Sequence, residues 1–308
     1  MPNQDVPELL RVHLVDASPY IFRAFFSIPS KVKAPDGSPA NAVYGFGGFL
    51  LKLLDDEKVS HAAFAFDRSL TTSFRNDLYP AYKAQRELPP PELEAQLNGC
   101  QQLAEAFGLA TFESERYEAE DLLASLLDPL AEEAPEARRV LVSSDKDLTQ
   151  LVDERTELFD FAKDVHFGPA EVKEKFGVEP AQIADYLALA GDSVDNIPGV
   201  PGIGKKTAAA LLAHLPTLEA LLERTDEVAE LSIRGARSLA KKLVEHADIA
   251  RLSKKLAIIA KDAPVQASLD DLRLGGIDEE RFAALVERWG FTRFAARVDA
   301  WQAKQESA

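Results

Sequence analysis

Short apolar runs that end in aspartate constrain the fold of this chain more than any other feature. Residues 11–16 read Arg-Val-His-Leu-Val-Asp, residues 62–67 read Ala-Ala-Phe-Ala-Phe-Asp, and the run at 140–144 leads directly into Asp145. Buried parallel strands have this apolar character, and α/β proteins place their sites at the carboxyl ends of such strands. The pattern therefore predicts an α/β fold with a central, mostly parallel sheet flanked by helices.

The other segments fit around such a sheet. A further short strand is expected at 156–161, and helices are expected at 42–54, at 92–107 and from Pro169 to the end of the chain. Between residues 74 and 91 basic residues alternate with aromatic ones and three prolines follow, a composition suited to phosphate contact and base stacking. We expect that segment to leave the sheet as an excursion.

Composition sets broad limits on the class of protein. The 308 residues are 46% hydrophobic and 28% charged, which is typical of a soluble globular chain with a substantial core. The sequence contains no run of eighteen apolar residues, so no membrane span is expected. The N-terminal residues do not have the pattern of a secretory leader. The single cysteine, Cys100, cannot form an internal disulfide. These features predict a cytoplasmic protein.

The net charge of −16 argues at first against a nucleic-acid partner, because phosphate binding requires basic surface. The charge is unevenly distributed, however. Between residues 232 and 261 eight basic residues stand against two acidic ones. A local basic surface is therefore compatible with the acidic total.

The stretch from Gly191 to Thr207 joins carboxylates to a glycine-rich turn. Asp192 and Asp195 have the i, i+3 spacing that points two side chains the same way when they share a helical turn. The prolines and glycines that follow predict a tight turn into a helix that begins near Lys205. Such a turn exposes backbone N–H groups where a phosphate binds well. A purely structural corner explains the glycines but leaves the carboxylates unexplained.

A P-loop is the competing interpretation of this turn. Gly199, Gly204 and Lys205 match G-x-x-x-x-G-K, but Lys206 stands where a P-loop has the Ser or Thr that binds Mg²⁺. Thr207 is one residue too late. The sequence therefore disfavours a P-loop.

Acidic residues recur where the predicted elements end or begin. Each is compatible with helix capping, but capping does not explain why so many fall at one predicted edge of the sheet. If they converge, repulsion raises their pKa values unless cations neutralise them, and Mg²⁺ suits carboxylate oxygens. Five scattered histidines and one cysteine offer no zinc-binding spacing. The acidic residues are Asp16, Asp67, Glu118, Glu120, Asp121, Asp145, Asp147, Asp192 and Asp195.

The order of these motifs resembles a known family, the bacterial and phage 5′-nucleases. The chain is most similar to the 5′→3′ exonuclease domain of DNA polymerase I, with the eukaryotic flap endonucleases as more distant relatives. The resemblance covers roughly residues 11–300. It is carried by Asp16, Asp67, Tyr-Glu-Ala-Glu-Asp at 117–121, Ser-Asp-Lys-Asp at 144–147 and the glycine-rich stretch at 191–204.

The resemblance implies an architecture beyond the sheet itself. It implies an α/β nuclease core at residues 1–185, with a helical arch at about 68–100. A helical region at 186–308 would contain a helix–three-turn–helix module that binds DNA, with the C-terminal helices packing back on the core.

The resemblance also implies roles for individual residues. Asp16, Asp67, Glu118 and Glu120 would hold one Mg²⁺. Asp145 and Asp147 would hold a second, with Glu120 shared and with Asp192 and Asp195 binding partly through water. Asp121 would be a further acidic metal-site position. Arg75, Lys83 and Arg86 would contact the scissile phosphate and the 5′ strand, and Arg23 would be a basic residue near the site. Gly199, Gly202, Gly204, Lys205, Lys206 and Thr207 would hold duplex backbone, with K⁺ at the hairpin. Position 120 is Glu where bacterial relatives usually have Asp.

The expected function is a structure-specific 5′-nuclease that acts in DNA replication and repair as a 5′→3′ exonuclease and flap endonuclease. It would use two Mg²⁺ ions, replaceable by Mn²⁺, act as a monomer, and cut DNA with free 5′ ends or flaps and RNA primer–DNA hybrids. A DNA-junction-binding protein without catalysis and a metal-dependent RNase are the alternatives. The complete acidic set disfavours the first of these, and the glycine-rich turn with the basic segment disfavours the second.

Overall fold

The computed structural model describes residues 9–68 and 72–307, and in this part of the chain a six-stranded sheet forms the centre. The strand order is β3-β2-β1-β4-β5-β6, and every neighbouring pair is parallel except β5 and β6. This confirms the predicted mostly parallel sheet. The strands are β1 (Arg11–Asp16), β2 (His61–Asp67), β3 (Ala110–Ser114), β4 (Arg138–Val142), β5 (Thr156–Asp160) and β6 (Val165–Phe167).

Side chains along the strands point alternately to the two faces of the sheet, and this divides the core into two layers. In β1, Val12 and Leu14 belong to one apolar cluster, and Val15 belongs to the cluster on the opposite face. Phe64 of β2 lies on the same face as Val15, and Ala63 lies on the other. Both faces of the sheet are therefore covered, as expected for parallel strands.

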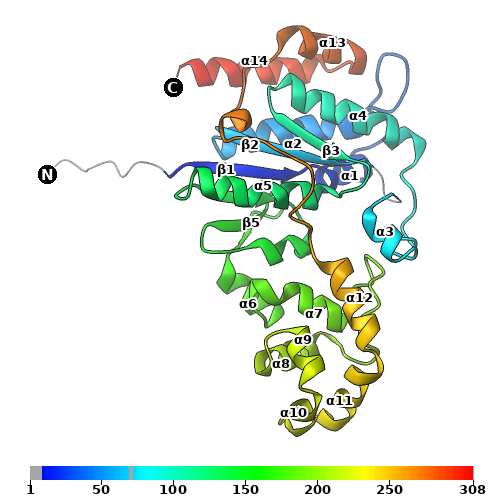
Figure 1. Ribbon diagram of the computed structural model, residues 1–308. Coiled ribbons are helices and arrows are strands. Elements are labelled where there is room, and N and C mark those ends of the chain that lie inside the picture. The colour runs from blue at the N-terminus through cyan, green and yellow to red at the C-terminus, as the bar shows by residue number, and fades with distance from the viewer. Residues whose placement is uncertain (1–8, 69–71, 308) are drawn as a thin grey trace, which may run out of the picture.

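Helices from both ends of the chain cover the Val15 face, and Figure 1 shows the C-terminal helices stacked beyond α2 and α4. An ideal Cβ at Gly99 would lie 2.6 Å from the Trp289 ring, and one at Gly47 would lie 2.9 Å from Phe294. The glycines thus permit close packing between these helices. The helices of this layer are α1 (Ser18–Ser27), α2 (Asn41–Asp56), α4 (Pro91–Ala106), α13 (Glu279–Trp289) and α14 (Thr292–Glu306).

The opposite face packs on α5 (Ala119–Glu133), and beyond it the chain continues into a region of short helices (Figure 1). None of the described helices is both long and apolar enough to cross a membrane. The remaining elements are α3 (Phe74–Leu78), η1 (Lys146–Leu151), α6 (Pro169–Phe176), η2 (Pro180–Gln182), α7 (Ile183–Ala190), α8 (Lys205–His214), α9 (Leu218–Glu223), α10 (Thr225–Glu230), α11 (Ala236–Glu245), α12 (Ala247–Ala257) and η3 (Asp270–Leu272).

The strand order places a crevice at the carboxyl end of the sheet. Strands β1, β2 and β3 follow one another outward in one direction, and β4 and β5 follow in the other, so the order reverses between β1 and β4. In open α/β sheets, ligands bind at such a reversal, outside the carboxyl ends of the strands. The topology therefore directs attention to the residues that follow β1 and β4.

Candidate active site

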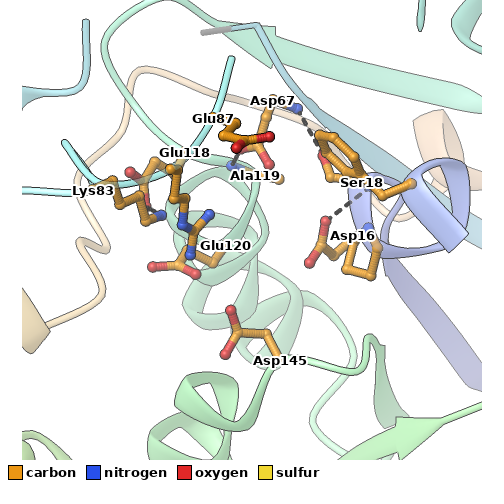
Figure 2. Close-up of a pocket in the computed structure, with 12 residues that line it drawn as sticks. Asp16, Ser18, Asp67, Lys83, Glu87, Glu118, Ala119, Glu120 and Asp145 are labelled. Carbon is orange, nitrogen blue, oxygen red and sulfur yellow. Dashed lines mark hydrogen bonds and ion pairs between the residues drawn. The ribbon is translucent and has the colours of Figure 1, made fainter. Parts of the chain in front are cut away.

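Two aspartates end the central strands and are fixed by serines. Asp16 ends β1, and its carboxylate accepts hydrogen bonds from the Ser18 amide (3.2 Å) and the Ser143 hydroxyl (2.8 Å). Asp67 ends β2, and its amide donates to the Ser18 hydroxyl (3.3 Å) (Figure 2). These hydrogen bonds hold the side chain of Asp16 at the reversal point. Sequence reasoning did not single out either serine.

The first turn of α5 brings two more carboxylates to this edge. Glu118 is the N-cap of α5, and the Ala119 amide donates to the Asp67 carboxylate at 2.8 Å. Asp67 therefore ties the start of α5 to the end of β2. Glu120 lies in the first turn and faces the same space (Figure 2).

The segment after β4 completes the edge. Asp145 caps η1 by accepting a hydrogen bond from the Asp147 amide (2.9 Å). Helix capping, the structural alternative for these acidic residues, is therefore confirmed for Asp145. Asp145 also lines a cavity of about 400 Å³ together with the carboxylates from β1, β2 and α5. The structure thus brings five of the predicted acidic residues around one cavity (Figure 2): Asp16, Asp67, Glu118, Glu120 and Asp145.

Asp192 and Asp195 reach this region by a different geometry from the one predicted. They do not share a helical turn, because Asp192 pairs with Ile197 across a tight loop in which Asn196 has a φ of 57°. Their carboxylates consequently bind different cations. The Asp192 carboxylate contacts the Lys146 ammonium at 2.5 Å, and that of Asp195 contacts the Arg86 guanidinium at 2.5 Å.

The segment from Phe74 to Pro91, which we call the arch segment, lies directly against these carboxylates. The Lys83 ammonium contacts Glu118 at 2.8 Å, and the Lys83 amide donates to the backbone carbonyl of Asp195 at 3.0 Å. The Tyr82 hydroxyl donates to Glu118 (3.2 Å) or Asp195 (3.3 Å). Lys83 has a φ of 53°, a conformation that costs energy for a residue other than glycine. Strained backbone of this kind clusters at functional sites.

Charge is concentrated at this edge. Burial and the neighbouring Asp67 raise the pKa of Asp16, and burial and Glu118 raise the pKa of Glu120. Burial and Asp145 raise the pKa of Asp147 to about 7. Burial and the repulsion between these carboxyls together therefore outweigh the lysines and arginines around them.

The pKa of Asp192 shifts in the opposite direction from those of Asp16, Glu120 and Asp147. Burial alone would raise its pKa, but the Lys146 ammonium and the hydrogen bond from the Val194 amide together outweigh that effect, so the pKa is lowered. Lys146 also contacts Asp147 at 3.1 Å, so it joins η1 to the loop after α7. Its position between two aspartates in Ser-Asp-Lys-Asp was the available signal for this role, and sequence reasoning missed it.

Within residues 9–68 and 72–307, no three His, Cys, Asp or Glu side chains converge closely enough to hold a metal ion as the side chains stand. Lys83, Arg86 and Lys146 lie among the carboxylates instead. The site is thus a cluster of acidic groups paired with cationic side chains. The carboxyls with raised pKa values, such as Asp16 and Glu120, can still be neutralised by an added cation.

Arg23 lies outside this cavity, contrary to its predicted place near the carboxylates. Phe22 lines the acidic cavity, whereas the next residue, Arg23, lines a separate cavity of about 330 Å³ with Lys52 and Phe161. Successive helical residues point about 100° apart, which explains the difference. Arg23 is exposed there.

Arg75 and Asp121 also differ from their predicted roles as phosphate contact and metal ligand. Arg75 is 0% exposed, and its guanidinium binds both oxygens of Asp121 at 2.7 and 2.8 Å. The Asp121 oxygens additionally accept hydrogen bonds from the amides of Glu118 (3.1 Å) and Ala260 (2.8 Å). Because both groups are fully engaged with protein partners, neither is free for a phosphate or a metal ion.

The glycine-rich hairpin, residues 199–204, forms the predicted turn. Gly199 and Gly202 have φ values of 64° and 78°, and α8 begins at Lys205 as predicted. An ideal Cβ at Gly199 would lie 2.4 Å from the Gly191 amide nitrogen, so glycine is required there. Helix α7, not a strand, precedes the turn, which excludes the strand–loop–helix arrangement of a P-loop.

Lys205 and Lys206 are exposed at the start of α8, and Thr207 is half-buried. A Cβ at Gly204 would meet nothing within 4 Å, so the backbone at the N-cap is open to solvent. Backbone N–H groups at such a helix start are a suitable surface for phosphate oxygens.

Comparison with known proteins agrees with this geometry. Residues 11–177 match the family described as 5′-3′ exonuclease, N-terminal resolvase-like domain, and residues 178–280 match 5′-3′ exonuclease, C-terminal SAM fold. DNA polymerase I of Bacillus subtilis is 39% identical over 98% of this chain and 34% of its own length. The corresponding protein of Rhizobium leguminosarum is 40% identical over 92% of this chain and 28% of its own length. The chain thus spans about a third of the length of the curated relatives that it matches.

Solved structures share the fold at lower identity. The phage T5 5′-exonuclease with bound divalent metal ions (zinc) has a TM-score of 0.65 and 20% identity, over 91% of this chain and 99% of the other. The catalytic core of Rad2 in complex with DNA substrate has a TM-score of 0.61 and 16% identity, over 92% and 89%. The family match extends over both the sheet and the helical region. This chain belongs to the 5′-3′ exonuclease family of nucleases.

Proposed function

We propose that this chain is a structure-specific 5′-nuclease that hydrolyses phosphodiesters at 5′ ends and 5′ flaps of DNA, in replication and repair. One observation carries the proposal. Carboxylates from β1, β2, α5 and η1 line a single cavity at the carboxyl edge of the sheet, and Lys83 and Arg86 line it from the arch segment. Membership of the 5′-3′ exonuclease family supports the same reaction class.

The donor set fits divalent metal ions. Mg²⁺ takes carboxylate oxygens while keeping several waters, so it needs one or two protein ligands and no closed cage. Asp16, Asp67, Glu118 and Glu120 would hold one ion, and Asp145, Asp147, Asp192 and Asp195 the second, with Glu120 shared. When bound, two such ions stabilise the attacking and leaving oxygens of an in-line displacement. The bound divalent ions of the T5 5′-exonuclease support this assignment, and Mn²⁺ and a K⁺ ion at the hairpin belong to the same proposal.

The residues of the chain itself prepare the substrate. Lys83 and Arg86 line the cavity and offer positive charge there. When a scissile phosphate binds, they would exchange their present carboxylate partners for phosphate oxygens. Asp16 stays in place because two hydrogen bonds hold it. Duplex backbone would lie along the hairpin and α8. The DNA in the T5 flap endonuclease and Rad2 complexes supports this partner.

Replacing Lys205 and Lys206 together by alanine should weaken DNA binding in a salt-dependent way. Each lysine that neutralises a duplex phosphate adds about 0.9 to the slope of log K against log salt, so the slope should fall in magnitude by up to about 2. Fluorescence anisotropy with several duplex sequences measures this. The matched control is Lys163→Ala with Lys173→Ala, two exposed lysines paired with Asp160 and Glu179. A slope equal to that of the control variant would show that the two lysines do not face DNA.

The raised pKa values predict how metal ions affect stability. A carboxyl whose pKa is higher in the folded than in the unfolded chain keeps its proton longer when folded, so metal-free stability should fall as pH rises from about 4 towards 7. Mg²⁺ bound to the ionised carboxylates reverses this loss. The rise in Tm from EDTA to Mg²⁺ should therefore be larger at about pH 8 than at about pH 5. An equal rise at both pH values would contradict the metal assignment.

Substrate comparison tests the proposed function. Cleavage of a labelled 5′-flap duplex is measured beside single-stranded DNA, blunt duplex and an RNA·DNA hybrid of the same sequence. We expect the flap to be cut fastest, because its duplex part can bind the hairpin while its 5′ strand occupies the cavity. Binding of the flap without cleavage of any substrate would favour a junction-binding protein instead.

A further inference from the structure

Arg75 is a buried side chain that joins three separate parts of the molecule. It belongs to α3 at the base of the arch segment, and its Nη atoms bind both carboxylate oxygens of Asp121 on α5. Its Nε donates to the Leu256 carbonyl and its Nη2 to the Ile258 carbonyl, both at 2.9 Å, at the end of α12. One guanidinium thus connects the arch segment, the helix that carries site carboxylates, and the helical region.

The connection continues from Asp121 to the cavity. Asp121 accepts a hydrogen bond from the Glu118 amide in the capping box of α5, so the ion pair fixes the residue that begins the helix. The Arg75 guanidinium also lies 3.7 Å from the Glu118 carboxylate and 3.8 Å from that of Glu120. Glu118 and Glu120, the two cavity carboxylates at the start of α5, therefore lie beside a fixed positive charge.

The end of α12 is itself tied to the hairpin and to η1. The buried Ser253 hydroxyl accepts a hydrogen bond from the Gly199 amide at 3.0 Å. Gln150 donates to the Ala257 carbonyl and accepts from the Ile259 amide, both at 3.0 Å. Arg75 consequently binds a segment that also contacts the hairpin and η1, the element that Asp145 caps.

We propose that Arg75 is a positioning residue, which sets the first turn of α5, with Glu118 and Glu120, relative to the hairpin and to Asp145. The inference deepens the proposed nuclease function and rests on it. Arg75 does not touch the substrate, because it is fully buried. It acts through Asp121 and the carbonyl groups of α12.

Arginine is required in this position for geometric reasons. A planar guanidinium can bind a carboxylate through two parallel hydrogen bonds and still donate to two carbonyls, whereas a lysine ammonium is a point charge with three donors on a flexible stem. Arg75→Lys therefore keeps the buried positive charge opposite Asp121 but loses the planar set of hydrogen bonds that fixes Asp121 relative to the carbonyls of α12. This makes it the suitable test variant, since the charge balance of the core is preserved.

Four readouts on Arg75→Lys follow from the proposal. In metal-free protein, amide hydrogen exchange in the first turn of α5, from Ala119 to Leu122, should become faster than in the wild type. Affinity for Mn²⁺, measured by calorimetry without DNA, should fall 10- to 100-fold, the usual result of removing a partner that orients metal ligands. With flap substrate, kcat should fall about 100-fold while the Kd for the flap in Ca²⁺ changes less than about three-fold. All measurements are made well below the Tm of the variant.

Arg116→Lys is the matched control, because Arg116 forms an exposed ion pair with Asp77 of α3 at 2.9 Å and should affect none of these quantities. A lower Tm for Arg75→Lys with unchanged exchange, Mn²⁺ affinity and kcat would overturn the inference and show a merely structural ion pair. If the wild type binds no Mn²⁺ and cuts no flap, the proposed function fails. Hydrogen exchange still decides whether Arg75 positions α5 in that case, because it depends on neither metal nor substrate.

Discussion

Replacing Asp145 or Asp192 by alanine should reduce flap cleavage by about two to three orders of magnitude, the loss typical of removing one group that stabilises charge in the transition state. Asp145 lines the cavity and caps η1, and Asp192 binds Lys146 from the loop after α7. Neither residue lies on the hairpin surface. The Kd for the flap in Ca²⁺ should therefore stay within about two-fold of the wild-type value.

Asp128→Ala provides the matched control for these variants. Asp128 lies on α5, as Glu120 does, but it is 70% exposed and pairs with Lys261 at 3.2 Å. It should leave both kcat and flap affinity unchanged. Near wild-type turnover of Asp145→Ala or Asp192→Ala at saturating Mg²⁺ would contradict the assignment of these residues to metal binding.

The second large effect is expected for Lys83→Ala, which should lower kcat about 100-fold with little change in flap affinity. Lys83 binds Glu118 in the free protein and would reach a phosphate only when the 5′ strand lies in the cavity. Because alanine and lysine are both L-residues with a Cβ, each meets a similar penalty at a φ of 53°, so the change removes charge without adding backbone strain. Single-turnover rates and anisotropy separate the two effects.

The same account predicts how a blocked 5′ end behaves. The arch segment is held against the loop after α7, because the Asn196 amide group donates to the Ala81 carbonyl at 2.6 Å and the Gln85 amide group donates to the Val194 carbonyl at 2.9 Å. We propose that a free single strand enters the cavity under this segment, where a bulky protein on the 5′ end would not fit. A block added before the enzyme should prevent cutting, and one added afterwards should not. Equal cleavage in both orders would show that the arch segment does not gate entry.

Much of the site could be predicted from the sequence because strand ends are easy to recognise. Asp16 and Asp67 end apolar runs, and parallel strands necessarily bring their carboxyl ends to one edge. Strands β3 and β6 were not predicted. Strand β3 is half-buried at the edge of the sheet and carries Glu113, and β6 has only three residues.

The direction of a helical side chain was harder to predict than its position in the chain. Glu120 faces the cavity, whereas the next residue, Asp121, points back to Arg75. Phe22 and Arg23 divide between two cavities in the same way. Motif order alone assigned Arg23, Arg75 and Asp121 to the site. Neighbouring helical positions point about 100° apart, so only the packing partners decide which one faces the site.

The most direct test of the central claim is cleavage of a 5′-flap duplex, labelled at its 5′ end, by the wild-type protein in Mg²⁺ and in EDTA. The account predicts cutting at or beside the flap junction in Mg²⁺, complete loss of cutting in EDTA, and recovery when Mg²⁺ is restored. Undiminished cleavage in EDTA, or tight flap binding with no Mg²⁺-dependent product, would contradict the claim that the carboxylates at this edge of the sheet form a metal-dependent nuclease site.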